Sequence, residues 1–311
     1  MTTAPSSSRI LPEDPSATNW RYTTRTFRAL GYSFAVRSTV EELGRLFDRL
    51  YEPCAVRGEE PEAWYSIESP EMGGSQLQVS VDGHRLFSSV QTSPLVRRIS
   101  WDVNYQVIQR SSDFVLLHAA AASRDGVGVL LPAASEAGKT TLVAGLVRSG
   151  FAYLTDEAAG IDPATLLIQA YPKPLTIDPG SWEVLADLAP TEPELARGFH
   201  RGQWHVSPLS LRSNVVSEPV LGRILVFPRY VQGAQVRCEP LSRSTALVEL
   251  MRHTFRFEEA RQRNIEVLAR VIGAARCYSL VGGDLAAACA AIHDLVETSI
   301  SGEGKSKNDP S

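Results

Sequence analysis

The sequence contains very little lysine. Its 31 basic residues include four lysines, so the other 27 are arginine. Lys305 and Lys307 lie in the polar stretch 301–311 (SGEGKSKNDPS), which we expect to be disordered, so the folded part of the chain holds Lys139 and Lys173 alone. The planar fork of arginine cannot replace a compact ammonium group. These two positions are therefore the first candidates for a site that needs a point charge.

The chain also lacks the features of several broad classes of protein. Its 31 basic residues do not exceed its 35 acidic ones, so we expect no nucleic-acid partner. No run approaches the roughly 20 apolar residues of a membrane-spanning helix, and residues 1–19 lack the regions of a signal peptide. We therefore expect no membrane association. The cysteines show no metal-ligand spacing and are expected to be small buried hydrophobes in a reducing compartment, which predicts a cytoplasmic protein: Cys54, Cys238, Cys277 and Cys289.

The length of 311 residues and the hydrophobic content of 43% allow one large domain or two ordinary ones. We predict disordered ends at 1–18 and 299–311, a small α/β domain over 19–112 without a chemical motif, and a larger domain over 113–298. Hydrophobic periodicity indicates extended chain at 22–37, helices at 38–50 and 94–109, and strands at 64–67, 77–81 and 86–87. In the larger domain it indicates strands at 114–123, 127–131, 151–155, 166–170, 175–177, 221–227 and 275–280, helices at 142–149, 244–254, 258–274 and 284–298, and a partly helical excursion at 181–216.

The strongest motif is A-A-S-E-A-G-K-T at residues 133–140, here called the GKT loop. It follows a predicted buried strand and precedes a predicted helix, as in the phosphate-binding pattern G-x-x-x-x-G-K-[ST]. In such loops backbone N–H groups surround the β-phosphate and the helix N-terminus adds partial positive charge. Lys139 would contact the β- and γ-phosphates, and the Thr140 hydroxyl would complete a Mg²⁺ shell. The predicted ATP-binding residues are Ala133, Ala134, Ser135, Glu136, Ala137, Gly138, Lys139, Thr140 and Thr141.

Two positions of the GKT loop depart from the pattern. Ala133 stands where the first glycine is expected, and its methyl group requires a negative φ. Glu136 occupies a position often filled by glycine, so its carboxylate must turn to solvent. The alternative interpretation is an ordinary strand–turn–helix with an accidental GKT.

An acidic pair, Asp156 and Glu157, follows the strand predicted after the GKT-loop helix. If that strand is the parallel neighbour of the one before the loop, Asp156 lies beside Lys139 and Thr140 at the carboxyl end of the sheet. Asp156 would then hold Mg²⁺, directly or through water, and Glu157 would accept the proton of an attacking hydroxyl. A solvated strand end is the alternative for the pair.

Two further candidates are less specific. His118 lies within a strand among small alanines, which leave room for the imidazole to face a ligand; a hydrogen-bonded core histidine is the alternative. Lys173 lies between two prolines in Tyr171-Pro172-Lys173-Pro174, so it is either a stiff cationic arm near phosphates or a surface lysine.

These residues together resemble the HPr kinase/phosphorylase family. The segments YPKPLTI (171–177), ILVFPRY (224–230) and PLSRSTALVEL (240–250) add to the likeness, which covers about residues 112–298 and is sharpest at 114–177. Within the family the chain resembles the HPr-kinase-related proteins found near peptide-tailoring genes, including kinases that phosphorylate a serine of lasso-type peptides. The resemblance implies an α/β fold: a P-loop HPr-kinase-like domain, a mixed sheet with flanking helices, preceded by a small α/β N-terminal domain.

The resemblance also implies roles for individual residues. Asp156 matches the first member of the family's acidic pair, at Mg²⁺, and His118 the histidine near the phosphoryl-transfer centre. Glu157 stands where HPr kinases have the aspartate that deprotonates the acceptor serine, and it is one methylene longer. The segment by which HPr kinases grip HPr and reverse the reaction has no clear counterpart, so phosphorylase activity is not predicted.

The predicted function is an ATP-dependent, Mg²⁺-requiring kinase that phosphorylates a serine-type hydroxyl on a small protein or peptide. The predicted catalytic residues are Glu157, Asp156, His118 and Lys139; Thr140 and Asp156 are the predicted metal ligands, and Lys173 joins the ATP site. The N-terminal domain would recognise substrate or mediate assembly, and a homo-oligomer stays open. The alternatives are a non-catalytic ATP-binding module in a biosynthetic complex and a small-molecule hydroxyl kinase.

Overall fold

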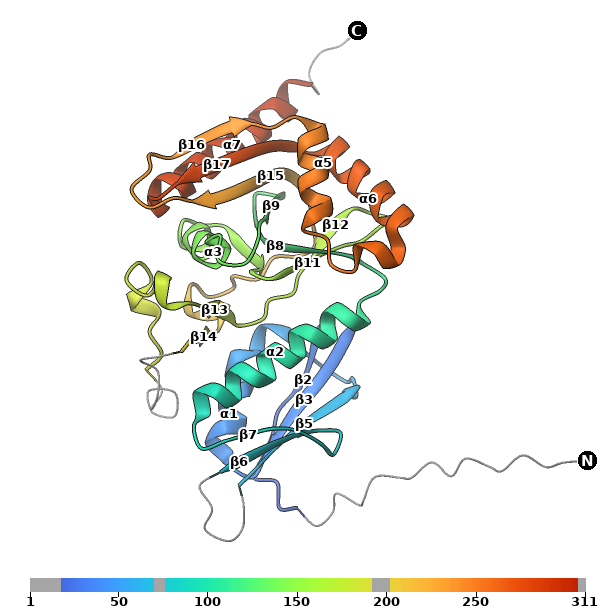
Figure 1. The fold of residues 1–311 in the computed structure, drawn as a ribbon, viewed down its shortest axis with the longest axis vertical. Helices are drawn as coiled ribbons and strands as arrows, with labels where there is room; N and C mark the ends of the chain where they lie inside the picture. Colours follow the sequence, from blue (N-terminus) through green and yellow to red (C-terminus); the bar gives the residue numbers. More distant parts are fainter. Residues whose placement is uncertain (1–17, 70–75, 192–201, 307–311) are drawn as a thin grey trace, which may run out of the picture.

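The structure is a computed structural model that describes residues 18–69, 76–191 and 202–306, and every structural statement below refers to these ranges. The predicted disordered start lies outside them except for Thr18, as do residues 192–201 of the predicted excursion and the last five residues. Within them the chain is a mixed α/β protein with one main sheet in its N-terminal third and a second in the remainder (Figure 1).

The N-terminal sheet has the strand order β4-β2-β3-β5-β6-β7, with β1 paired to β3. Two helices pack against it through apolar residues at helical spacing, including Leu43, Phe47, Leu95 and Ile99. The elements are β1 (Tyr22–Thr23), β2 (Thr26–Ala29), β3 (Tyr32–Ser38), α1 (Glu41–Leu50), η2 (Glu52–Cys54), β4 (Ala55–Val56), β5 (Ala63–Glu68), β6 (Leu77–Val81), β7 (His84–Ser89) and α2 (Thr92–Arg110).

The second part of the described chain holds the larger sheet, a two-stranded sheet of β13 and β14, and the remaining helices. Its strands are β8 (Val115–Arg124), β9 (Val127–Pro132), β10 (Ala152–Thr155), β11 (Ala158–Ile161), β12 (Leu167–Gln169), β13 (Leu175–Ile177), β14 (Trp204–Val206), β15 (Val220–Tyr230), β16 (Arg237–Pro240) and β17 (Arg276–Gly282). Its helices are α3 (Lys139–Arg148), η3 (Pro179–Ser181), η4 (Ala186–Leu188), η6 (Pro208–Ser210), α5 (Arg243–Arg252), η7 (Phe257–Ala260), α6 (Arg261–Ala274) and α7 (Leu285–Ser306).

Strand β8 is the centre of the larger sheet. A turn at Asp125 and Gly126, both with positive φ, joins it to β9 as an antiparallel hairpin. Its other edge pairs antiparallel with β10 and then with β11, so these two strands run along β8 as one line interrupted at Asp156 and Glu157. Residues 119–122 are alanines with no exposed surface, which suits a strand covered on both faces.

The sequence-based strand order was wrong at this point. We expected the strands before and after α3 to be adjacent, but β8 lies between β9 and β10. The physical reason is that both edges of β9 are occupied, one by its hairpin partner β8 and the other by β15, so β10 pairs with the other edge of β8. Because β9 and β10 are each antiparallel to β8, they are parallel to each other and their carboxyl ends still reach the same edge of the sheet.

Within the described ranges each predicted helix matches an α-helix, with ends that differ by a few residues and a larger difference at the C-terminus. Helix α7 continues to Ser306, beyond the end expected at Thr298, so the tail predicted to be disordered from residue 299 is helical over its first residues.

No helix in the described ranges is long and apolar enough to cross a membrane. All four cysteines are free thiols, and Cys238 alone is half-buried rather than buried.

Candidate functional site

Four parallel strands bring their carboxyl ends to one edge of the larger sheet. Strand β15 is parallel to both β9 and β17, and β10 has the same direction. A cleft of about 1420 Å³ opens at this edge. It is lined by residues of the GKT loop, the acidic pair, the segment 176–184 and the ends of β15 and β17.

The GKT loop has the backbone conformation that its sequence requires. Gly138 precedes α3 with a φ of 86°, in the left-handed region. Ala133 is not among the residues with positive φ, so its methyl group is accommodated as the pattern demanded. Glu136 has a φ of 64°, a strained value for a non-glycine residue, and its side chain is exposed.

The ammonium group of Lys139 is buried and folds back onto the loop. Its Nζ donates to the carbonyl oxygens of Ala133 and Ala134 at 2.9 and 2.8 Å and lies 3.1 Å from His118 Nε2. Desolvation lowers the pKa of Lys139, opposed by the charges of Glu157 and Asp156. A phosphate oxygen would replace one or more of these acceptors and would favour the charged form of Lys139.

His118 faces Lys139 and Glu157 from the start of β8. Burial, aided by the positive charge of Lys139, lowers the pKa of His118 to about 4. The ring is therefore neutral at neutral pH, and its 3.6 Å approach to Glu157 Oε1 is not an ion pair. His118 Nε2 can accept a hydrogen bond from Lys139 Nζ when Nδ1 carries the ring hydrogen. The half-buried side chain lines the cleft, which favours the ligand-facing interpretation over a core histidine.

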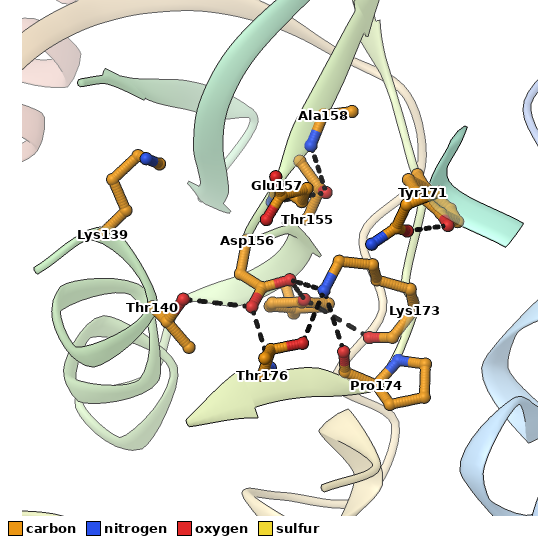
Figure 2. A network of polar contacts seen from close by, with 12 residues as sticks. Lys139, Thr140, Thr155, Asp156, Glu157, Ala158, Tyr171, Lys173, Pro174 and Thr176 are labelled. Atoms are coloured by element: carbon orange, nitrogen blue, oxygen red, sulfur yellow. Dashed lines mark hydrogen bonds and ion pairs between the residues drawn. The ribbon is translucent and has the colours of Figure 1, made fainter. Parts of the chain in front are cut away.

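Asp156 is almost fully buried and accepts four hydrogen bonds (Figure 2). Oδ2 accepts from the Thr140 hydroxyl at 3.1 Å and from the Thr176 backbone N–H at 3.2 Å. Oδ1 accepts from the Tyr153 hydroxyl at 3.0 Å and from Lys173 Nζ at 2.7 Å. The register shift between Tyr153 and Thr155 is a β-bulge, which turns the residues that follow it out of the strand pattern. Asp156 therefore has a fixed orientation toward the first turn of α3.

Glu157 differs from its neighbour in exposure. Its side chain keeps about a third of its surface in the cleft, at 36% exposure, whereas that of Asp156 keeps 1%. Desolvation raises the pKa of Glu157, opposed by Lys173 and Lys139 and reinforced by Asp156. A carboxylate with a raised pKa that faces a cleft has the properties of a proton acceptor.

Lys173 is neither a surface lysine nor a group that lines the cleft. Its side chain is 2% exposed, and besides Asp156 its Nζ donates to the Pro174 carbonyl at 3.0 Å. Figure 2 shows it on the side of Asp156 away from Thr140. In this position Lys173 compensates the buried charge of Asp156. A direct role of Lys173 at phosphates stays a prediction.

One contact that the sequence did not predict joins the N-terminal part of the chain to this pair. Tyr171, fully buried, donates from its hydroxyl to Asn104 Oδ1 of α2 at 2.5 Å, and its backbone N–H donates to the carbonyl of the bulge residue Leu154. The Lys173 N–H donates to the Tyr171 carbonyl. Helix α2 therefore holds the segment that carries Lys173.

A second unpredicted feature is His205 on β14, opposite Thr176. It is 4% exposed, and neither ring nitrogen has a hydrogen-bond partner within the described residues. Burial, aided by the charge of Lys173, lowers the pKa of His205 to about 3. No local pattern around Trp204-His205-Val206 distinguishes this histidine from an exposed one.

Replacing His205 by leucine is expected to make the free energy of unfolding less dependent on pH below about 6.5. The folded state keeps the ring neutral while the unfolded state gains a proton below its ordinary pKa of 6.5, so stability is lost as pH falls from about 6.5 toward 3. Removing the group should reduce that slope by up to about 1.4 kcal/mol per pH unit. Urea unfolding at pH 7.5, 6 and 5 measures this slope. The control is His84→Leu, which replaces an exposed histidine. An unchanged slope in the His205 variant contradicts this expectation.

The residues present fit a Mg²⁺ ion bound together with phosphates. The Thr140 hydroxyl and an Asp156 carboxylate oxygen lie within hydrogen-bond distance of each other, and hard oxygen donors are what Mg²⁺ prefers. The described residues contain no cluster of three or more His, Cys, Asp or Glu side chains that would hold a metal without a further ligand. A carboxylate, a hydroxyl and substrate phosphates are an ordinary set for this ion.

The fold and the cleft define a mixed α/β protein in which a GKT loop, its lysine and two acids meet at one edge of a sheet. No family model matches the chain, and no curated protein matches it. Among solved structures, the HPr(Ser) kinase/phosphatase from Coxiella burnetii is similar over 62% of this chain and 99% of that chain, with 12% identity and a TM-score of 0.28. These values are too low for the likeness to identify the function or the site residues.

Proposed function

We propose that the protein is an ATP-dependent, Mg²⁺-requiring kinase that phosphorylates a serine-type hydroxyl of a peptide or small protein. The observation that carries the proposal is the shared cleft of four groups: the Lys139 ammonium, the Thr140 hydroxyl and the carboxylates of Asp156 and Glu157. Their spacing serves phosphate binding, metal binding and proton acceptance, the functions that phosphoryl transfer requires.

The GKT loop and α3 would bind the phosphates of ATP. The backbone N–H groups of the loop and the N-terminal end of α3 favour anions, and Lys139 adds the mobile positive charge. Thr140 and Asp156 would hold Mg²⁺, which supplies charge neutralisation at the phosphates when bound. Thr141 lies beside them, and its hydroxyl forms a 2.6 Å hydrogen bond with Ser181, which links α3 to the other wall of the cleft.

Glu157 would accept the proton of the attacking hydroxyl. The acceptor oxygen then forms a bond to the γ-phosphorus of ATP, the bond from that phosphorus to the β–γ bridging oxygen breaks, and ADP leaves with that oxygen. His118 would stay neutral and, through its contacts with Lys139 and Glu157, would hold these two side chains beside the transferred group. Most of the rate enhancement would come from positioning and charge neutralisation.

Replacing Lys139 by methionine is expected to abolish Mg·ATP binding while the protein stays folded. Methionine fills a similar volume and removes a desolvated charge, so the loss is one of ligand binding rather than of packing. At about 100 times the Kd, a ligand stabilises the folded state by about 2.7 kcal/mol, which the variant should lose. Thermal unfolding with and without Mg·ATP measures this, with Arg45→Met on the exposed face of α1 as control.

The same measurement separates the kinase from a module whose loop binds no nucleotide, whereas the absence of phosphate transfer separates it from a module that binds ATP without catalysis. The Lys139 donors are engaged by its own loop, as expected for a loop that binds no phosphate, and an inert module would show no Mg·ATP shift in the wild type. Labelled ATP offered with serine peptides, matched alanine peptides and small hydroxyl compounds then separates a peptide kinase from a metabolite kinase. Label on the serine peptides alone supports the proposal.

A further inference from the structure

The cleft extends beyond the GKT loop on the side away from the acidic pair. Across the sheet the strands run β10, β8, β9 and β15, so the loop after β9 has Asp156 and Glu157 on one side and the end of β15 on the other. The residues that line this second side come from β15, β17 and the start of α7: Pro228, Tyr230, Leu280, Gly282 and Leu285. We refer to it as the β15 side of the cleft.

Tyr230 is the large aromatic residue of this side. It ends β15, lines the cleft and is 58% exposed. Its Cβ lies 3.6 Å from the position that a Cβ on Gly138 would occupy, so the side chain begins directly beside the GKT loop. A single exposed aromatic is common on protein surfaces, but this one borders an anion-binding loop within a cleft.

The backbone around Tyr230 is fixed by the neighbouring turn. The Val231 N–H donates to the Gly282 carbonyl at 3.0 Å, and the Gly283 N–H donates to the Ala234 carbonyl at 3.1 Å. A Cβ on Gly283 would lie 2.5 Å from the Val231 carbonyl oxygen, so this contact needs glycine. The turns that follow β15 and β17 are therefore hydrogen-bonded to each other, and Tyr230 lies next to these bonds.

We propose that Tyr230 stacks on the base of the bound nucleotide; this rests on the proposed function. The reacting phosphate must face Glu157, so the nucleoside extends to the opposite side of the loop, where the tyrosine ring is exposed. Every nucleobase offers a π-face, so the contact favours nucleotides over free phosphates without choosing strongly among bases. Removing such a stacking ring weakens binding about 5- to 150-fold.

The test compares a ligand with a base and one without. The affinities of Mg·ATP, Mg·GTP and Mg·tripolyphosphate are measured by calorimetry on the full chain, for the wild type and for Tyr230→Ala and Tyr230→Phe. We expect Tyr230→Ala to weaken both nucleotides about 5- to 150-fold and to leave tripolyphosphate unchanged. Tyr230→Phe keeps the ring and should bind all three as the wild type does.

The remaining outcomes overturn the stacking contact in different ways. If Tyr230→Ala binds nucleotides as the wild type does, or weakens tripolyphosphate equally, the ring does not contact the base, while the phosphate site stands. If the wild type binds neither ATP nor tripolyphosphate, the proposed function fails and the stacking contact fails with it.

Discussion

The variant Glu157→Gln is expected to bind Mg·ATP as the wild type does and to transfer phosphate about 10²- to 10⁴-fold more slowly, the range for loss of a general base. Glutamine keeps the size of the side chain but cannot accept a proton. Calorimetry gives the ATP affinity, and transfer from labelled ATP to serine peptides gives the rate. Glu183→Gln, which changes an exposed carboxylate outside the cleft lining, is the matched control. Undiminished transfer in Glu157→Gln would remove this residue from the mechanism.

The pH dependence of transfer provides an independent check of the same role. A base acts in its ionised form, so the rate should fall as pH decreases through the pKa of Glu157. Because desolvation raises that pKa above the ordinary value of 4.5, the acid limb lies at a higher pH than an exposed glutamate would give. His118, with its pKa lowered to about 4, stays neutral over the upper part of this range. The limb should be absent from the residual activity of Glu157→Gln.

The variant Lys173→Met is expected to lower the free energy of unfolding by about 3–5 kcal/mol, because it leaves the Asp156 carboxylate buried without its cation. Urea denaturation at pH 7 measures the loss. The exposed pair of Arg45 and Glu41 on α1 supplies the control, since Arg45→Met removes a solvent-screened charge and should change the free energy of unfolding far less.

A double variant separates the lost ion pair from lost packing. Lys173→Met with Asp156→Asn removes both charges, and we expect it to be more stable than Lys173→Met alone. If the two substitutions are additive, Lys173 stabilises the fold through its hydrocarbon stem, and the charge compensation assigned to it is wrong.

Much of the larger sheet could be predicted because its signals are local. The Asp125-Gly126 turn, the buried run before the GKT loop and the helix after it depend on neighbouring residues, and the structure places each where the pattern indicated. The strand order could not be predicted in this way. Which edge of β8 pairs with β10 depends on the packing of segments about 30 residues apart, which hydrophobic periodicity does not report.

The candidate site shows the same division. The Thr140 hydroxyl oxygen lies 3.1 Å from Asp156 Oδ2, so the two residues lie side by side as expected. The strand adjacency from which we predicted this was wrong. The prolines beside Lys173 indicated stiffness but gave no information on direction, so its burial against Asp156 came only from the structure. Asn104 and Tyr171 are 67 positions apart and carry no motif. The roles of Thr140, Asp156 and Lys173 as ligand or catalytic groups remain predictions.

The hydrogen bond between Asn104 and Tyr171 has a consequence for how the chain can be divided. The boundary predicted at 112/113 would separate α2 from the YPKP segment, and a gene fragment encoding only the later residues would leave a deeply buried phenol without its acceptor. The residues before 113 therefore support the segment that carries Lys173, the partner of Asp156. An activity lost on deleting them could not be assigned to substrate recognition, because this support would be lost as well.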